Sequence, residues 1–217
     1  MVLSTRTFTT HSADIPPLQN GDRLNRLEFE RRYTAMPELK KAELIEGLVY
    51  MGSPLRITKH GKPHSDLLGW LVYYAAFTTN VEVGDNCTVR LDLDNEPQPD
   101  ALLRVKQNGQ SVVSVDGYVE GAPELVVEIA ASTVSMDLHQ KLNVYRRNQV
   151  QEYIVWRVED EALDWFRLRN GEYINLEADD QGCISSELFP KLRLDIQALL
   201  SGNMAQVMQT LQATLSE

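Results

Sequence analysis

The segment that most constrains the fold is Glu124–Ala130, which reads ELVVEIA. Its run of apolar residues consists of Leu125, Val126, Val127 and Ile129. A run of this kind indicates a strand buried on both faces, in the middle of a sheet. Glu128 interrupts the run, and a carboxylate cannot stay charged in a dry core unless it is paired or bound to a metal. The segment therefore predicts a central strand and a partner for Glu128.

Helical and extended patterns alternate around this strand. Amphipathic or buried helical spacing covers Leu24–Met36, His64–Thr79, Thr133–Arg147 and Met204–Leu215. Further extended segments are expected at Glu43–Ile45, Leu48–Met51, Val81–Val83, Cys87–Leu93, Ala101–Val105, Tyr153–Val158, Asp164–Leu168 and Tyr173–Leu176. The pairs Glu46-Gly47 and Asn170-Gly171 are typical of tight hairpin turns. This order predicts an α/β fold with a mixed central sheet flanked by helices.

Length and composition indicate one domain. The chain has 217 residues, of which 43% are hydrophobic, enough to bury a core. We interpret residues 1–22 as a flexible N-terminal arm and residues 23–217 as a single domain that ends in a helix. The uncharged, largely apolar stretch Leu67–Val81 is shorter than the roughly 20 apolar residues that span a bilayer. No signal-peptide pattern opens the chain, so we expect a cytoplasmic protein.

The net charge argues against a protein that coats nucleic acid nonspecifically. The formal charge is −10, and nonspecific binding depends on neutralising phosphates with Lys and Arg. Residues 1–110 hold 13 Lys and Arg against 14 Asp and Glu, whereas residues 111–217 hold 8 against 17. The excess of acid thus lies in the second half, and a local basic face on the first half remains compatible with phosphate binding.

Two acids and a lysine form a candidate metal site. Asp100 follows Pro99 at the start of an expected strand, so that Asp100 and Glu128 could come from adjacent strands and share one cation. Mg²⁺ prefers oxygen ligands and keeps several waters, one of which can become a nucleophile. Lys141, on the following helix, could orient that water or stabilise charge on a phosphate. Tyr145 lies one helical turn further on the same face.

Each of these residues also has a purely structural interpretation. Glu128 could form a buried ion pair with a nearby Lys or Arg. Asp100 after a proline is a common turn residue. Lys141 could be a solvated helix lysine with Asp137 as its i,i+4 partner, and Tyr145 could be part of the core. The functional interpretation therefore depends on the combination and order of the residues.

Three stretches of the sequence carry a resemblance to a known family. They are PQPDALL, ELVVEIAASTVSMDLHQKLNVYRRNQVQEYIVW, and ELIEGLVYMGSP followed by His64. Together they resemble the Uma-two family, once classified as domain of unknown function 820, within the PD-(D/E)XK restriction-endonuclease-like superfamily. The resemblance covers roughly Leu24–Asp195. It implies a restriction-endonuclease-like core in which a mixed sheet is flanked by helices.

The resemblance also implies roles for individual residues. Asp100 matches the motif aspartate of the family, Glu128 the second acid, and Lys141 a lysine displaced onto the helix. Glu46 matches the acid of the first conserved segment, which would reach the metal through water. His64 matches the histidine near the start of the long helix, although a histidine there is more often a capping or core group. His64 and Tyr145 are therefore expected to support the ligands and not to bind the metal.

The chain departs from the superfamily pattern at two positions. Ala130 stands where the lysine usually follows the second acid, so Lys141 must reach the site from the helix, and Ala131 replaces a common family proline. The predicted function is that of a nuclease dependent on Mg²⁺ or Mn²⁺ that hydrolyses phosphodiester bonds in DNA. The alternative is a nuclease-like domain that binds nucleic acid or a protein partner without cutting. The resemblance further implies a homodimer.

Overall fold

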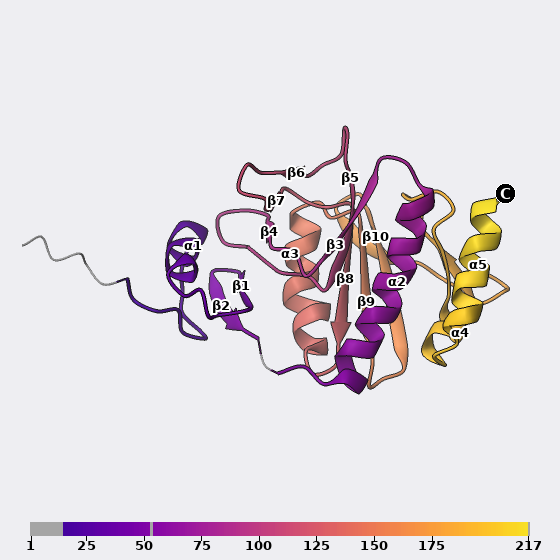
Figure 1. Ribbon diagram of the computed structural model, residues 1–217, viewed down its shortest axis with the longest axis horizontal. Helices are drawn as coiled ribbons and strands as arrows, with labels where there is room; N and C mark the ends of the chain where they lie inside the picture. Colours follow the sequence, from indigo (N-terminus) through magenta and orange to yellow (C-terminus); the bar gives the residue numbers. More distant parts are fainter. Residues whose placement is uncertain (1–14, 53, 217) are drawn as a thin grey trace, which may run out of the picture.

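A six-stranded mixed sheet forms the centre of the molecule (Figure 1). The structure is a computed structural model and describes residues 15–52 and 54–216. The sheet has the order β11-β10-β9-β8-β5-β3, in which β8 and β9 are parallel and all other neighbours antiparallel. Its strands are β3 (Val81–Asp85), β5 (Ala101–Val105), β8 (Leu125–Ala130), β9 (Glu152–Arg157), β10 (Ala162–Arg169) and β11 (Glu172–Asn175).

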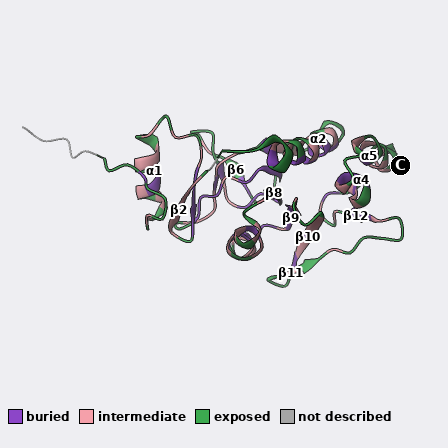
Figure 2. Cartoon of the chain, turned by 90° about the horizontal axis from the view of Figure 1, so that it is seen from below, coloured by how far each residue is buried: buried purple, intermediate pink, exposed green. Residues whose placement is uncertain are grey.

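Helices cover both faces of this sheet (Figure 2). One face carries α2 (Lys62–Phe77) together with α4 (Ile196–Leu200) and α5 (Met204–Ser216). The other carries the π-helical turn η2 (Met136–Lys141) and α3 (Leu142–Arg147), which link β8 to β9. Helix α2 continues from a second π-helical turn, η1 (Ile57–Gly61), and has a proline in its first turn, where the absent N–H is no loss. Within the described residues, no helix has the length and apolarity to cross a membrane.

Strand β8 is buried over all six residues, as the sequence predicted. Because side chains alternate along a strand, Leu125, Val127 and Ile129 pack in the cluster that includes α2 and α5. Val126 and Ala130 belong to the cluster on the α3 side. Glu128 lies between these two residues in the alternation, and its carboxylate consequently faces the helix that carries Lys141.

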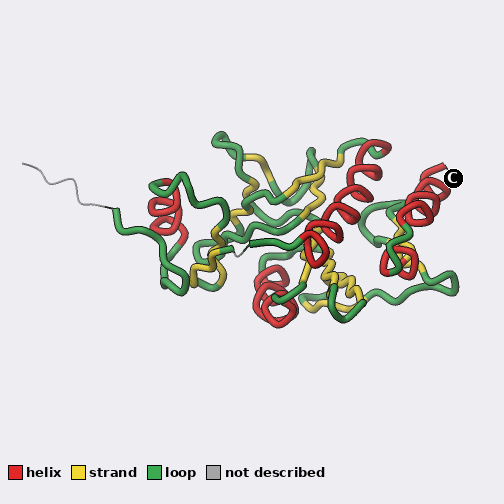
Figure 3. Tube along the Cα trace, turned by 60° about the horizontal axis from the view of Figure 1, so that its bottom comes forward, coloured by secondary structure: helices red, strands yellow, loops and turns green. Residues whose placement is uncertain are grey.

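A small unit at one end of the molecule contains α1 (Arg26–Thr34), β1 (Ala42–Ile45) and β2 (Leu48–Met51) (Figure 3). It has its own hydrophobic cluster, formed by Leu18, Phe29, Ala42, Leu44 and Val49. The burial of Leu18 corrects part of the sequence interpretation. Leu18 packs in this unit, and the exposed Gly21 is attached to it because its N–H donates to the carbonyl of Val49. Residues 1–14 of the expected arm lie outside the described part of the chain.

The two tight hairpin turns lie at the positions that the sequence predicted. Asn170 and Gly171 have φ values of 52° and 82° and join β10 to β11. Glu46 and Gly47 have φ values of 52° and 73° and join β1 to β2. Such positive values are those of the hairpin turns that favour Asn and Gly. The predicted α/β class with a mixed sheet between helices is confirmed.

Four short strands and one short helix were not predicted. They are β6 (Val112–Val113), β7 (Val119–Glu120), β12 (Cys183–Ser185), β13 (Arg193–Asp195) and α4. Strand β4 (Val89–Arg90) was predicted, but it is shorter than expected. Only two residues of the expected extended segment Cys87–Leu93 pair, and they do so in a separate small sheet with β7. Strands of two or three residues are too short for an alternation of polar and apolar residues to be recognised.

Glu152 attaches the turn before Leu192 to the sheet. Its Oε1 accepts the N–H groups of Glu187 and Leu188 at 2.9 and 3.0 Å, and its Oε2 accepts Trp165 Nε1–H and the Ser186 hydroxyl at 3.1 and 2.8 Å. The residue is fully buried. One carboxylate thus satisfies four donors inside the protein.

Replacing this carboxylate should destabilise the fold. We expect Glu152→Ala to lower the free energy of unfolding by about 3 kcal/mol, because buried donors left without an acceptor cost about 1–3 kcal/mol each and some will regain water. Urea denaturation measures the change. The control is Glu172→Ala at an exposed position of β11, which should change stability by less than about 0.5 kcal/mol. Equal effects of both substitutions would contradict the assigned role of Glu152.

Candidate active site

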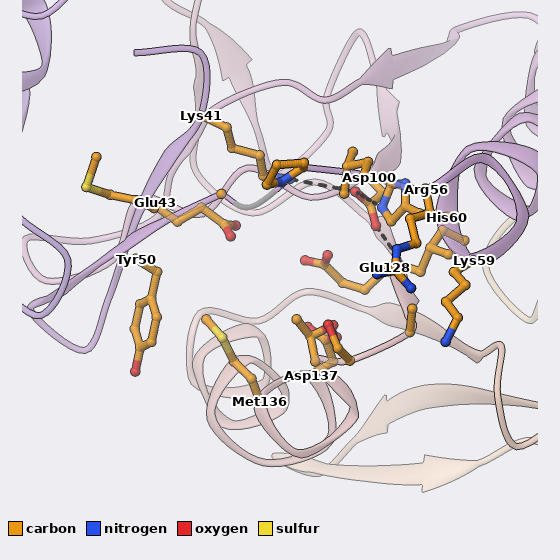
Figure 4. A pocket seen from close by; sticks show the side chains of 18 of the residues that line it. Lys41, Glu43, Tyr50, Arg56, Lys59, His60, Asp100, Glu128, Met136 and Asp137 are labelled. Atoms are coloured by element: carbon orange, nitrogen blue, oxygen red, sulfur yellow. Dashed lines mark hydrogen bonds and ion pairs between the residues drawn. The ribbon is translucent and has the colours of Figure 1, made fainter.

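A cavity of about 790 Å³ lies where the β1–β2 unit, η1, the end of β8 and η2 meet. Its lining includes five acids, Glu43, Asp100, Glu128, Asp137 and Glu159, and the lysines Lys40, Lys41, Lys59 and Lys141. Figure 4 shows the carboxylates of Glu43, Asp100, Glu128 and Asp137 directed into the same space. The cavity thus combines buried acids with several cations.

Asp100 and Glu128 come from neighbouring strands. Asp100 immediately precedes β5, Glu128 lies within β8, and Ala101 is the register partner of Val127. The Asp100 Oδ2 atom accepts the backbone N–H of Ile129 at 2.8 Å, which holds the carboxylate beside β8. Each of the two acids is only 3% exposed. The structure therefore brings together the two acids that the sequence singled out.

Lys141 and Tyr145 reach Glu128 from the helix that follows β8. Lys141 Nζ lies 2.9 Å from Glu128 Oε1, and the Tyr145 hydroxyl donates to the same oxygen at 2.8 Å. The Glu128 carboxylate accepts both of these hydrogen bonds at Oε1, and no residue in the ranges 15–52 and 54–216 donates a hydrogen bond to Oε2. The four-residue spacing of Lys141 and Tyr145 places both on one helix face.

Burial and charge oppose each other at these groups. Burial raises the pKa of Glu128 above its usual value, whereas the ammonium of Lys141 acts in the opposite direction. For Lys141, burial favours the neutral amine, but Glu128 and Glu43 outweigh it and raise the lysine pKa well above its ordinary value. Lys141 therefore stays protonated at neutral pH. It can supply positive charge and hydrogen bonds, and it cannot act as a general base.

Asp137 is a further buried acid of this group. Its Oδ1 lies 4.0 Å from Lys141 Nζ, and its Oδ2 accepts the Thr133 hydroxyl at 2.6 Å. Burial raises the pKa of Asp137, and Lys141 opposes this shift. The i,i+4 pair that the sequence suggested thus exists, although it is buried and not on a solvated helix face.

Asp100 is held in its ionised form. His60 Nε2 lies 3.1 Å and Lys41 Nζ 3.6 Å from Asp100 Oδ1. Burial favours the protonated acid, but the hydrogen bond from His60 and the positive charge of Lys41 outweigh it and lower the pKa of Asp100 to about 2. Both contacts are marked in Figure 4. Asp100 therefore remains a carboxylate across the physiological range.

Glu43, and not Glu46, joins this group. The Glu43 Oε1 atom accepts Lys141 Nζ at 2.9 Å and the backbone N–H of Gln98 at 2.8 Å. Glu46 occupies the exposed β1–β2 turn, pairs with Arg147 at 2.8 Å and does not line the cavity. Glu46 thus lies away from the cavity, because the β1–β2 turn that carries it is exposed. An acid inside the buried strand AELI was the overlooked signal, since it is the same anomaly as Glu128.

His60 and His64 differ in whether they contact the carboxylate of Asp100. His64 Nε2 lies 2.9 Å from the backbone carbonyl of Asp100 and 3.1 Å from Asp85 Oδ1, so it touches the backbone of Asp100 and not its carboxylate. His60, one turn earlier, contacts the carboxylate directly and is buried. No sequence pattern distinguished these two positions, because the turn η1 that orients His60 has no recognised signal.

The donor set fits a divalent cation of the magnesium type. Among the described residues, no group of three or more His, Cys, Asp or Glu side chains lies close enough together to hold a metal. Mg²⁺, however, is commonly bound by one or two carboxylates and keeps several waters. Asp100 and Glu128 provide two carboxylates on one cavity, and Glu128 Oε2 has lone pairs to spare.

The fold and this cavity define a class of protein. A mixed sheet between helices, with two acids on neighbouring strands and a lysine close to the second acid, is a restriction-endonuclease-like α/β domain. The family model of Uma2, described as "Putative restriction endonuclease", matches residues 27–197. The chain therefore belongs to the Uma2 family.

A solved structure shows the same fold. The crystal structure of a protein described as "a putative nuclease belonging to DUF820", from Anabaena variabilis ATCC 29413, is similar to this chain with a TM-score of 0.60 and 15% sequence identity. The similarity covers 79% of this chain and 96% of the other. At this identity the likeness establishes the fold alone. The comparison with curated proteins found no match.

Proposed function

We propose that the protein is a metal-dependent nuclease that hydrolyses phosphodiester bonds in DNA, with Asp100 and Glu128 as ligands of Mg²⁺ or Mn²⁺. The observation that carries the proposal is the convergence of these two buried carboxylates on one cavity, with Lys141 Nζ 2.9 Å from Glu128. Membership of the Uma2 family supports a nucleic-acid substrate. The homodimer that the resemblance implies stays a prediction.

The residues of the cavity have separate roles in this proposal. A bound Mg²⁺ would supply Lewis-acid polarisation of the phosphate and a water of lowered pKa. Asp100 is ionised before the metal arrives, because His60 and Lys41 hold its pKa low. Lys141, which stays protonated, places a positive charge where negative charge develops on the phosphate. Glu43 and Tyr145 position Lys141 and Glu128 through the hydrogen bonds described above.

The first test asks whether metal binding and cutting occur together. Calorimetry with Mn²⁺ should show one set of sites per chain, and Glu128→Gln should abolish the signal because it removes one of the two ligand charges. The same preparations are incubated with supercoiled plasmid in Mg²⁺ or in EDTA. We expect nicking by the unmodified protein in Mg²⁺ alone. Metal binding that Glu128→Gln leaves intact would contradict the ligand assignment.

A nuclease-like domain that binds without cutting is the second candidate. It is favoured by one observation, namely that Lys141 already neutralises Glu128 as a buried ion pair and could make a metal unnecessary. The two candidates differ in the calorimetric experiment. A protein that binds DNA but shows neither a Mn²⁺ signal nor nicking is the expected result for the second candidate and contradicts the first.

A further inference from the structure

Three exposed cations line the mouth of the cavity. Lys40 precedes β1, Arg56 immediately precedes η1, and Lys59 lies within η1. All three line the cavity, and we call them the cationic lip. Arg56 and Lys59 are labelled in Figure 4 near His60 and Asp100. In a chain with a net charge of −10, such a concentration of positive charge beside the acids requires an explanation.

Two of the three cations lack a protein counter-ion. Lys59 pairs with Glu159, which also lines the cavity. Lys40 and Arg56 form no ion pair with any residue of the described ranges 15–52 and 54–216. Exposed cations without counter-ions repel each other, and an anion that binds between them relieves the repulsion. The lip is therefore suited to phosphate groups.

Apolar side chains accompany the cations. Leu55 and Ile57, on either side of Arg56 in the sequence, are 67% and 77% exposed. Of these two, Leu55 lines the cavity, together with Leu39, Met51 and Met136. The faces of unpaired bases can pack on such side chains, and proteins that bind single strands combine a positive groove with surfaces for the bases. In a paired duplex these faces are stacked and inaccessible.

The burial of the acids also favours an unpaired strand over a duplex. Because Asp100 and Glu128 are almost fully buried at the cavity, a phosphodiester bond must enter the cavity to reach them. A duplex would have to unstack or unpair to insert one backbone, at a cost of about a few kcal/mol. An unpaired strand can bend into the cavity without that cost.

From these observations we propose that the substrate is single-stranded DNA, or an unpaired segment of it, whose phosphates bind to the cationic lip. This inference rests on the proposed nuclease function, which it extends by the form of the substrate. Arg56 and Lys40 act as phosphate-binding residues. Glu159 weakens the binding of DNA phosphates to the lip, because it neutralises Lys59 at the mouth of the cavity.

The test separates strand preference from cutting. Binding of a fluorescent 20-nucleotide single strand, and of the same sequence as a duplex, is measured by anisotropy in EDTA with the full-length protein. We expect the single strand to bind at least about tenfold more tightly than the duplex, because it avoids the unpairing cost. Equal or tighter binding of the duplex would overturn the proposal.

Two substitutions, with opposite expected effects on single-strand binding, test the role of the cationic lip. Arg56→Gln should weaken single-strand binding and reduce the slope of log K against log salt by about 0.7, the value for one phosphate contact to a single strand. Glu159→Gln should tighten binding, because it releases Lys59. The matched controls are Arg169→Gln and Glu187→Gln, which alter another exposed ion pair, lining a different hollow, and should leave both quantities unchanged.

The same proteins are then incubated with the single strand in Mg²⁺. If the proteins cut the single strand and the salt slope of Arg56→Gln equals that of the unmodified protein, the role of the lip is overturned. The nuclease function would then still stand. A slope that depends on Arg56 without any cutting would overturn the nuclease function while supporting the lip. The two failures are thus distinguishable.

Discussion

Asp100→Asn should lower the rate of Mg²⁺-dependent DNA cleavage by about 10³-fold or more, equivalent to about 4 kcal/mol of activation free energy. The substitution removes one ligand charge while an amide oxygen can still accept the Ile129 N–H that now donates to Asp100 Oδ2. The loss should therefore come from the metal and not from the fold. Initial rates on plasmid and on single-stranded DNA at saturating Mg²⁺ measure the effect.

The control for this substitution is Asp164→Asn. Asp164 belongs to the same sheet, in β10, pairs with Arg157 and does not line the cavity. The Asp164→Asn protein should keep nearly the full cleavage rate of the unmodified protein. Thermal unfolding of both variants shows whether either one is misfolded. A folded Asp100→Asn protein with a rate within tenfold of the unmodified protein would refute the role of Asp100.

Lys141→Met should lower the free energy of unfolding by about 3–5 kcal/mol, as found when one partner of a buried ion pair is removed. The ammonium lies 2.9 Å from both Glu43 and Glu128 and 4.0 Å from Asp137. Without it, three buried carboxyl groups face one another and must take up protons or repel. Urea denaturation at pH 7 measures the loss.

A double substitution tests the cause of this loss. In the Lys141→Met background, Glu128→Gln should recover part of the stability, because one of the uncompensated charges is then absent, and the two effects should not add. Lys62→Met is the matched control, since Lys62 forms an exposed i,i+4 pair with Asp66, and exposed pairs are worth about 1 kcal/mol or less. Additive effects of Lys141→Met and Glu128→Gln would contradict the coupling.

The parts of the site that sequence reasoning located share a physical basis. Glu128 stood out because a carboxylate in a run of apolar residues must find a partner. Asp100 and Lys141 followed from their positions at the start of one strand and on the next helix, and the register of β5 with β8 places them together. Local periodicity determines which face of a strand or helix a residue occupies, so these positions could be predicted.

The parts that escaped prediction depend on contacts across long stretches of chain. Glu43 reaches Lys141 over 98 positions of the sequence, and Lys59 reaches Glu159 over 100. The choice between His60 and His64 depends on a π-helical turn without a recognised sequence signal. The cationic lip likewise forms only because residues of the β1–β2 unit and of η1 line the same cavity.

The sequence by itself thus determined the α/β class, the buried central strand and the need for a partner at Glu128, because alternation and helical spacing are local properties of the chain. The tertiary structure alone decided that Glu43, and not Glu46, lines the cavity and that His60 holds Asp100 ionised. It also decided that exposed cations line the mouth of the same cavity as the buried acids. These features arise from the packing of the N-terminal unit on the sheet, and no local pattern encodes that arrangement.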